Sequence, residues 1–437
     1  MQIDQTTLSD ISIFHKDEEY SLFNKLNFTK TVGGTIELRK IFSTPHNNIK
    51  NIEGTQQVIS QIKDQLDHWP TSISNGTILM IEKFLDYPLD PIDENPVTLN
   101  NLLYRWIHPS DFSVIKYTVP HFIDFLSGLQ KISTLLQTDQ APASIQLPLK
   151  RMKALLNEGS LQKLAITNKT SLSTRQLLHY GGLLRDQYKH KVLELIDLYS
   201  LLDAWQSMAM ACKKFNLHFP TFSNEESVFL EAEGLFHLLL ENPVDYTIQL
   251  NDEHHFLFLT GANMAGKSTF IKSVGSAVFL AHIGMGVPAK SMKLCLFDGL
   301  LSNINVADNI VKGESYFYNE VQRIKNTITK IKDGKKWLIL IDEIFKGTNV
   351  TDAMKCSLAV IQGLLKAKNS LFILSTHLYE LGQELKSNSQ ISFRYFETQI
   401  KDDDMQFSYQ LKEGISQDRI GYLILSKEGL LTMLNEI

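Results

Sequence analysis

The chain has 437 residues, of which 43% are hydrophobic and 21% charged, and its formal net charge is −5. This composition excludes collagen-like, disordered and disulfide-scaffold proteins, and the length allows two or three domains. The three cysteines, Cys212, Cys295 and Cys356, lie too far apart for a zinc motif or a disulfide framework. We expect a cytoplasmic protein, because the N-terminus has no signal-peptide pattern and no apolar run reaches about 18 residues.

The sequence changes character near residue 220. Before this point, segments 55–68 and 186–216 repeat apolar residues every three or four positions, which predicts helices. After it, short apolar runs at 256–260, 337–341 and 371–376 alternate with helical segments. Such runs predict a parallel sheet that is buried on both faces. We therefore predict a mixed fold, with an all-α domain at 1–219 and an α/β domain at 220–437.

Basic residues are concentrated between positions 150 and 191, where nine of them accompany two acidic residues. The basic positions are Lys150, Arg151, Lys153, Lys163, Lys169, Arg175, Arg185, Lys189 and Lys191. Two interpretations stay open for this stretch. It forms either a surface that contacts phosphates or the ordinary solvated face of helices, which is the more common case.

A glycine-rich loop follows the strand predicted at 256–260 and has the pattern G-x-x-x-x-G-K-S. Backbone N–H groups of such loops surround phosphate oxygens, and the helix that follows directs its positive end at them. We expect Lys267 to contact the β- and γ-phosphates and the Ser268 hydroxyl to bind Mg²⁺. The predicted ATP-binding residues are Gly261, Ala262, Asn263, Met264, Ala265, Gly266, Lys267, Ser268 and Thr269.

Two further strand ends carry side chains suited to hydrolysis. Asp342 and Glu343 end the run at 337–341, and we predict that Asp342 holds magnesium through water while Glu343 orients or deprotonates the attacking water. His377 follows the run at 371–376. A lone histidine is more often a surface or core residue, but this position favours contact with the γ-phosphate or the water. Together with Lys267, these residues predict phosphoryl transfer to water.

Three segments together resemble the MutS DNA mismatch-repair ATPases, a branch of the ABC-type ATPases. They are TGANMAGKST at 260–269, LILIDEIFKGTN at 338–349 and LSTHLYEL at 374–381. Residues 306–321 resemble the signature segment of that family, within which Glu320 matches a glutamate, and residues 21–59 resemble the start of the family's helical core.

The resemblance implies an ATPase that uses Mg²⁺ and couples ATP binding and hydrolysis to DNA binding and to closure of a homodimer. In such a dimer Ser315 would act in trans on the partner's γ-phosphate, beside the catalytic residues Lys267, Glu343 and His377. The implied partners are double-stranded or branched DNA and other repair proteins. The implied role is DNA repair or recombination in the cytoplasm, with nucleoid association in a bacterium.

The chain also departs from the family pattern. It begins at the helical core, so we expect the mismatch-reading and connector domains to be missing. Lys346 stands where the family usually has arginine, and Tyr246 is the nearest candidate for stacking on adenine, although a tyrosine on a strand surface explains it equally well. The alternative function is a nucleotide-switched scaffold or interaction protein that does not read DNA directly, which the negative net charge favours.

Overall fold

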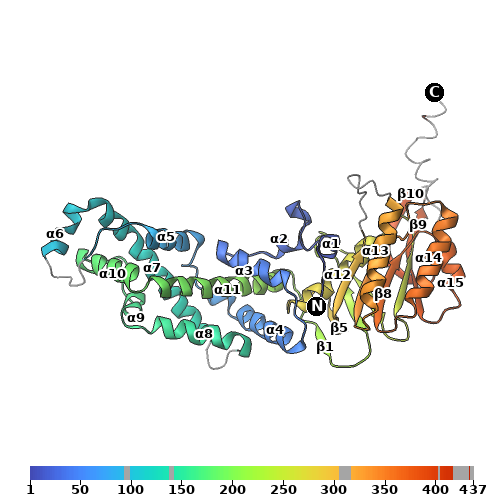
Figure 1. Ribbon diagram of the computed structural model, residues 1–437, viewed down its shortest axis with the longest axis horizontal. Helices are drawn as coiled ribbons and strands as arrows, with labels where there is room; N and C mark the ends of the chain where they lie inside the picture. The colour runs from blue at the N-terminus through green and yellow to red at the C-terminus, as the bar shows by residue number, and fades with distance from the viewer. Residues whose placement is uncertain (93–98, 137–141, 305–315, 402–403, 417–432, 434–437) are drawn as a thin grey trace. The chain divides into compact units, whose positions relative to one another are not determined.

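The computed structural model describes residues 1–92, 99–136, 142–304, 316–401, 404–416 and 433. These residues form two compact units (Figure 1). The α/β unit comprises residues 1–25, 45–52 and 216–437, and the helical unit comprises residues 26–44 and 53–215.

The division differs from the predicted boundary at 219, because the first 25 residues group with the α/β unit. Gln2 forms a parallel bridge to Gly299 at the start of strand β6 (Gly299–Asn303), and helix α1 (Gln5–Asp10) packs against the same strand. The buried Asp10 carboxylate accepts a hydrogen bond from Ser302 Oγ at 2.6 Å. The N-terminal segment therefore covers an edge strand of the sheet, which polar and apolar periodicity alone could not indicate.

Helices make up the regular structure of the helical unit within its described residues. Helix α4 (Ile49–Asp64) begins in the α/β unit and ends in the helical one. Helix α11 (Lys189–Lys214) has 26 residues and is shorter than the helix of 31 residues expected for segment 186–216. The helices are α3 (Val32–Ser43), α4 (Ile49–Asp64), η2 (Leu66–His68), α5 (Asn75–Asp86), α6 (Leu99–Ile107), α7 (Pro109–Leu135), α8 (Ala143–Leu156), α9 (Gly159–Ala165), α10 (Thr174–Asp186) and α11 (Lys189–Lys214).

Helices α3 and α11 lie side by side in the helical unit (Figure 1). The buried Asp203 on α11 accepts hydrogen bonds from the backbone N–H groups of Lys30 and Thr31 and from Thr31 Oγ1, at 2.7–3.0 Å. Thr31 in turn caps α3 by accepting from Gly34 N at 3.0 Å. A Cβ on Gly34 would lie 2.1 Å from Asp203 Oδ2, so the close approach requires glycine there.

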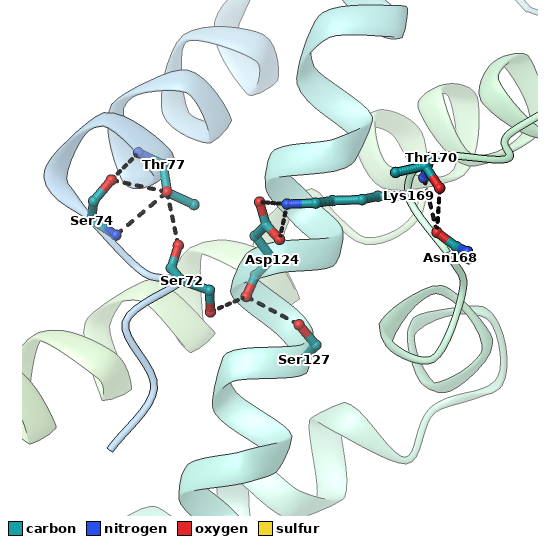
Figure 2. Close-up of polar contacts among 8 residues, drawn as sticks. All are labelled: Ser72, Ser74, Thr77, Asp124, Ser127, Asn168, Lys169 and Thr170. Atoms are coloured by element: carbon teal, nitrogen blue, oxygen red, sulfur yellow. Dashed lines mark hydrogen bonds and ion pairs between the residues drawn. The ribbon is translucent and has the colours of Figure 1, made fainter. Parts of the chain in front are cut away.

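Five of the nine basic residues between 150 and 191 contact acceptors within the helical unit. Lys169 pairs with Asp124 at 2.7 Å, as Figure 2 shows beside the capping box of Ser74 and Thr77 at the start of α5. The other four contacts are Arg151 with Glu194, Arg185 with the Leu89 carbonyl, Lys189 with Asp86, and Lys191 with Glu158. This pairing favours the interpretation as an ordinary helix surface for those five side chains.

The α/β unit contains, in its described residues, a six-stranded sheet of order β10-β9-β4-β8-β7-β6. The strands β9, β4, β8, β7 and β6 run parallel, and β10 pairs antiparallel with β9. The predicted mixed architecture is confirmed at this level, and the three predicted apolar runs are neighbouring strands. The strands of this sheet other than β6 are β4 (Phe256–Thr260), β7 (Trp337–Asp342), β8 (Ser370–Ser375), β9 (Ile391–Lys401) and β10 (Asp404–Glu413).

Helices cover both faces of this sheet, which explains why its central strands are apolar throughout. Gly275 on α12 packs against Leu340, whereas the neighbouring side chains Ile339 and Ile341 join a core with α13, α14 and α15. Side chains alternate between faces along a strand, so the two helical layers lie on opposite sides. The helices are α12 (Lys267–His282), α13 (Tyr316–Ile331), α14 (Val350–Leu364) and α15 (Tyr379–Leu385).

A second sheet in the described part of this unit has the order β1-β5-β2-β3. Its strands are β1 (Thr221–Ser223), β2 (Leu230–Leu235), β3 (Tyr246–Leu250) and β5 (Ser291–Cys295). The remaining short elements are η1 (Glu18–Tyr20) and α2 (Leu22–Leu26). No helix within the described ranges is both long enough and apolar enough to cross a membrane.

Candidate functional site

The glycine-rich loop joins the end of β4 to the start of α12. Three of its residues have positive φ angles: 141° at Gly261, 69° at Met264 and 107° at Gly266. A Cβ on Gly261 would lie 3.2 Å from the Phe396 carbonyl oxygen, so this position combines an unfavourable angle with a close neighbour. The loop therefore curls over the N-terminus of α12, where the backbone N–H groups of a first helical turn and the helix dipole favour an anion.

Lys267 is the first residue of α12 and is 5% exposed. Its Nζ donates hydrogen bonds to the carbonyl oxygens of Gly261 at 2.7 Å and Ala262 at 2.9 Å. Burial lowers the pKa of this amine, and the nearby carboxylates of Glu343 and Asp342 partly oppose that effect. The ammonium is thus held inside the loop, close to both carboxylates.

The carboxyl ends of β7 and β8 meet beside this loop because the two strands are parallel neighbours. The buried Asp342 accepts a short hydrogen bond from the Ser375 hydroxyl, and the Glu343 N–H donates to the Ser375 carbonyl at 3.0 Å. Glu343 has a φ of 56°, in the left-handed region that non-glycine residues rarely adopt. The strand end therefore turns sharply between the two acidic residues.

Two cationic or ionisable groups contact the Glu343 carboxylate. His377 Nδ1 lies 3.4 Å from Oε1, and Lys346 Nζ lies 2.9 Å from Oε2. The hydrogen bond with His377 and the pairing with Lys346 lower the pKa of Glu343 to about 2, although burial opposes this shift. For Lys346, burial lowers the pKa, but the hydrogen bond and charge of Glu343 outweigh burial and raise it. Glu343 is therefore ionised at neutral pH.

The loop that carries Lys346 is held by a second buried carboxylate. Glu320 on α13 is 4% exposed, and its two oxygens accept from the N–H groups of Lys346 at 3.0 Å and Gly347 at 3.1 Å. Sequence comparison singled out Glu320 by its match to the signature segment, but gave it no role in the site.

A cavity of about 460 Å³ opens beside the glycine-rich loop. Its lining includes Lys267, Ser268, Thr269 and Glu343, together with Leu240, Glu241, Asn242, Val244, Tyr246 and Tyr409. Asn263, Met264 and Gly266 also line it. The structure thus brings six of the nine predicted loop residues together with Glu343 around one space, and Asp342 and His377 lie adjacent to Glu343. The predicted residues Gly261, Ala262 and Ala265 do not line this cavity.

Tyr246 and Tyr409 both line this cavity, but their surroundings differ. Tyr246 is 6% exposed and packs edge-on against Phe270 and Phe396, with ring centroids 5.3 and 5.8 Å away. Tyr409 is 41% exposed and lies at an irregularity of β10 with a φ of 54°. Such a bulge re-aims a side chain, and the sequence of the strand carries no signal for it. Sequence reasoning therefore missed Tyr409.

Ser315, the residue expected to act in trans, lies outside the described residues.

The fold and the site define an α/β protein with a glycine-rich loop after the buried strand β4 and an Asp-Glu pair after β7, a parallel strand of the same sheet that is separated from β4 by β8. Within this domain, residues 257–432 match the MutS domain V family. This part of the chain is therefore similar to MutS domain V.

Relatives of the chain include DNA mismatch repair proteins MutS from several bacteria. The protein from Staphylococcus epidermidis is 30% identical over 243 residues, which are 54% of this chain and 27% of that protein. For Bacillus subtilis the identity is 30% over 54% of this chain and 28% of the relative, and for Petrotoga mobilis it is 27% over 56% and 30%. The chain matches less than a third of the length of each of these relatives.

Proposed function

We propose that the chain is an ATPase of the MutS type that binds ATP with Mg²⁺ and hydrolyses it at the cavity beside α12. The observation that carries this proposal is the convergence of Lys267, Ser268 and Glu343 on one cavity. These three side chains come from two segments about 75 residues apart in the chain. A lysine that only stabilised the fold would not explain why a glycine-rich loop surrounds it or why a carboxylate lines the same cavity.

The residues fit such a nucleotide. The loop at residues 261–269 offers backbone N–H groups at a helix N-terminus. The Lys267 ammonium donates to two carbonyl oxygens of this loop, and phosphate oxygens, being charged, are stronger acceptors than these carbonyls. The hydroxyl of Ser268, which lines the cavity, and the carboxylate of Asp342 are oxygen donors of the kind that Mg²⁺ prefers. We assign these two residues to the magnesium ion, with Asp342 acting through water.

Each side chain has a defined task in this proposal. Magnesium-bound ATP, when present, supplies the phosphoryl group and the ADP leaving group. Lys267 neutralises charge on the β- and γ-phosphates. Glu343 is ionised and holds a water molecule in line for attack, and its low pKa favours orienting that water over removing its proton early. His377, whose side chain is 54% exposed, contacts Glu343 and stabilises charge near the γ-phosphate.

The base of the nucleotide belongs against Tyr409 in this proposal. This tyrosine lines the same cavity as Lys267 and leaves 41% of its surface exposed, whereas Tyr246 already uses its ring for packing. A flat aromatic side chain offers an adenine ring a stacking surface. The assignment replaces Tyr246 as the preferred candidate.

Nucleotide binding would be coupled to assembly and to DNA. We propose that two chains close through their α/β units, with Ser315 of each chain completing the site of the other, and that the helical unit, as a MutS core, passes this closure on to double-stranded or branched DNA. Repair or recombination is the process this supports. The related MutS proteins are named for DNA mismatch repair, and the choice of DNA structure is a matter for experiment.

A second function has an observation of its own. Five of the nine basic side chains between 150 and 191 already contact acceptors inside the chain, which leaves fewer of them to bind phosphate. This pairing favours a nucleotide-switched scaffold that acts on protein partners without reading DNA.

Steady-state ATP hydrolysis tests both functions. The purified chain is assayed with Mg²⁺ alone and with perfect duplex, mismatched and branched DNA, and Glu343→Gln is the control. Stimulation by one of these DNA structures, lost in the variant, supports the DNA-coupled ATPase and shows which structure acts. Hydrolysis that depends on Glu343 but ignores every DNA supports the scaffold. Absence of hydrolysis, or equal hydrolysis by the variant, refutes the ATPase.

A further inference from the structure

One buried carboxylate outside the cavity is committed entirely to the loop that follows the Asp-Glu pair. Glu320 is 4% exposed, and both of its oxygens accept backbone N–H groups, from Lys346 at 3.0 Å and from Gly347 at 3.1 Å. Burying a carboxylate is unfavourable unless it is well hydrogen-bonded. The two bonds to consecutive amides therefore fix the main chain of this loop to α13.

Packing holds the same loop against the first turn of α13. The rings of Phe317 and Phe345 have centroids 5.6 Å apart. A Cβ on Gly347 would lie 2.7 Å from Phe317 N, so the two backbones approach as closely as glycine allows. The loop thus has both a polar and an apolar attachment to one helix.

The loop needs such attachments because its backbone is strained. Glu343 has a φ of 56° and Phe345 a φ of 61°. Left-handed conformations at non-glycine residues persist only where the surrounding structure holds them, and they concentrate at functional sites. Without the contacts to α13, the segment would relax toward ordinary backbone angles and carry Glu343 with it.

We propose that Glu320 is a positioning residue for the hydrolysis reaction. It fixes the backbone of Lys346, the Lys346 ammonium lies 2.9 Å from Glu343 Oε2, and Glu343 is thereby aimed into the cavity. Glu320 acts through this loop and does not itself line the cavity in the described structure. The inference rests on the proposed ATPase function for its catalytic consequence, whereas the attachment of the loop stands by itself.

The test compares Glu320→Gln with the matched control Glu384→Gln, which changes an exposed glutamate on α15 of the same unit. Glutamine keeps the size of the side chain but turns one acceptor into an N–H₂ group that faces a backbone donor. We expect kcat for ATP to fall about 10- to 100-fold, as a misplaced catalytic group requires, while KM stays within about twofold. The control is expected to behave as wild type.

Hydrogen exchange of the full chain provides a measurement that needs no activity. In the wild type, we expect the amides of Lys346 and Gly347 to exchange slowly, and in Glu320→Gln to exchange at least about tenfold faster, with no change in Glu384→Gln. Thermal unfolding is recorded for each variant. Glu320→Asp, which keeps the charge but shortens the side chain, is the second variant in case glutamine prevents folding.

The outcomes separate the two claims. A kcat of Glu320→Gln within about twofold of wild type, or fast exchange of both amides in the wild type, overturns the positioning role. A fall in kcat with equal loss of ATP affinity also overturns it, because that pattern indicates general damage to the site. If the wild type hydrolyses no ATP, the ATPase function fails, and unchanged exchange in Glu320→Gln then shows independently that Glu320 does not hold the loop.

Discussion

Replacing Gly34 by alanine tests how closely α3 and α11 are packed in the helical unit. The added methyl carbon would lie 2.1 Å from Asp203 Oδ2 and 2.6 Å from its Cγ, far inside van der Waals contact. Asp203 is 1% exposed and cannot swing into solvent without releasing the N–H groups of Lys30 and Thr31. The substitution must therefore either separate the helices or break this buried hydrogen-bond cluster.

The size of the effect follows from opposing contributions. Overpacking of this kind costs about 1–3 kcal/mol, and each lost hydrogen bond to a charged acceptor costs about 1.5–3 kcal/mol. Alanine in place of glycine in a helix returns about 1 kcal/mol. We expect Gly34→Ala to lower the free energy of unfolding by about 2–4 kcal/mol, since only part of the cluster needs to break.

Gly182→Ala in the same unit is the matched control. A Cβ there would lie 3.5 Å from the Ile92 side chain, which is an ordinary contact, so we expect stabilisation by about 0.5–1 kcal/mol. Urea unfolding followed by tryptophan fluorescence suits this comparison, because Trp69, Trp106 and Trp205 belong to the helical unit. Equal stability of wild type and Gly34→Ala would refute the close packing that we describe.

Three further predictions concern the cavity. Lys267→Ala should raise the Kd for ATP at least about 100-fold in calorimetry, since the buried ammonium is the cation that the loop places at the phosphates; tight binding by this variant would contradict the assignment. Tyr409→Ala should weaken ATP binding about tenfold but leave inorganic tripolyphosphate unaffected, because only the base stacks. Glu343 has a folded pKa of about 2, below its usual value of 4.5, so its stabilising contribution is complete above about pH 4.5 and disappears as pH falls through 2. The stability advantage of wild type over Glu343→Gln in urea unfolding should therefore shrink by about 2 kcal/mol between pH 6 and pH 3, and a constant difference would show that the pKa is not lowered.

Local sequence determined the parts of this protein that depend on neighbouring residues. Each central strand is a short apolar run, and the loop at Gly261–Gly266 needs glycine where φ is 141° and 107°. Because parallel strands end at one edge of a sheet, the Asp-Glu pair and His377 could be placed beside the loop from the sequence alone. The roles assigned to these residues stay predictions until hydrolysis is measured.

Tertiary structure decided the features whose partners are distant in the chain. Glu320 meets amides 26 and 27 residues later, and the first residues of the chain reach β6 near position 300. Tyr409 is turned toward the cavity by a strand irregularity that no residue pattern marks. The basic stretch shows the same limit, since Lys169 meets Asp124 only after α7 and the loop past α9 have packed. Periodicity records which face of an element is apolar, but not which distant polar group will satisfy a buried charge, because that depends on how the elements pack.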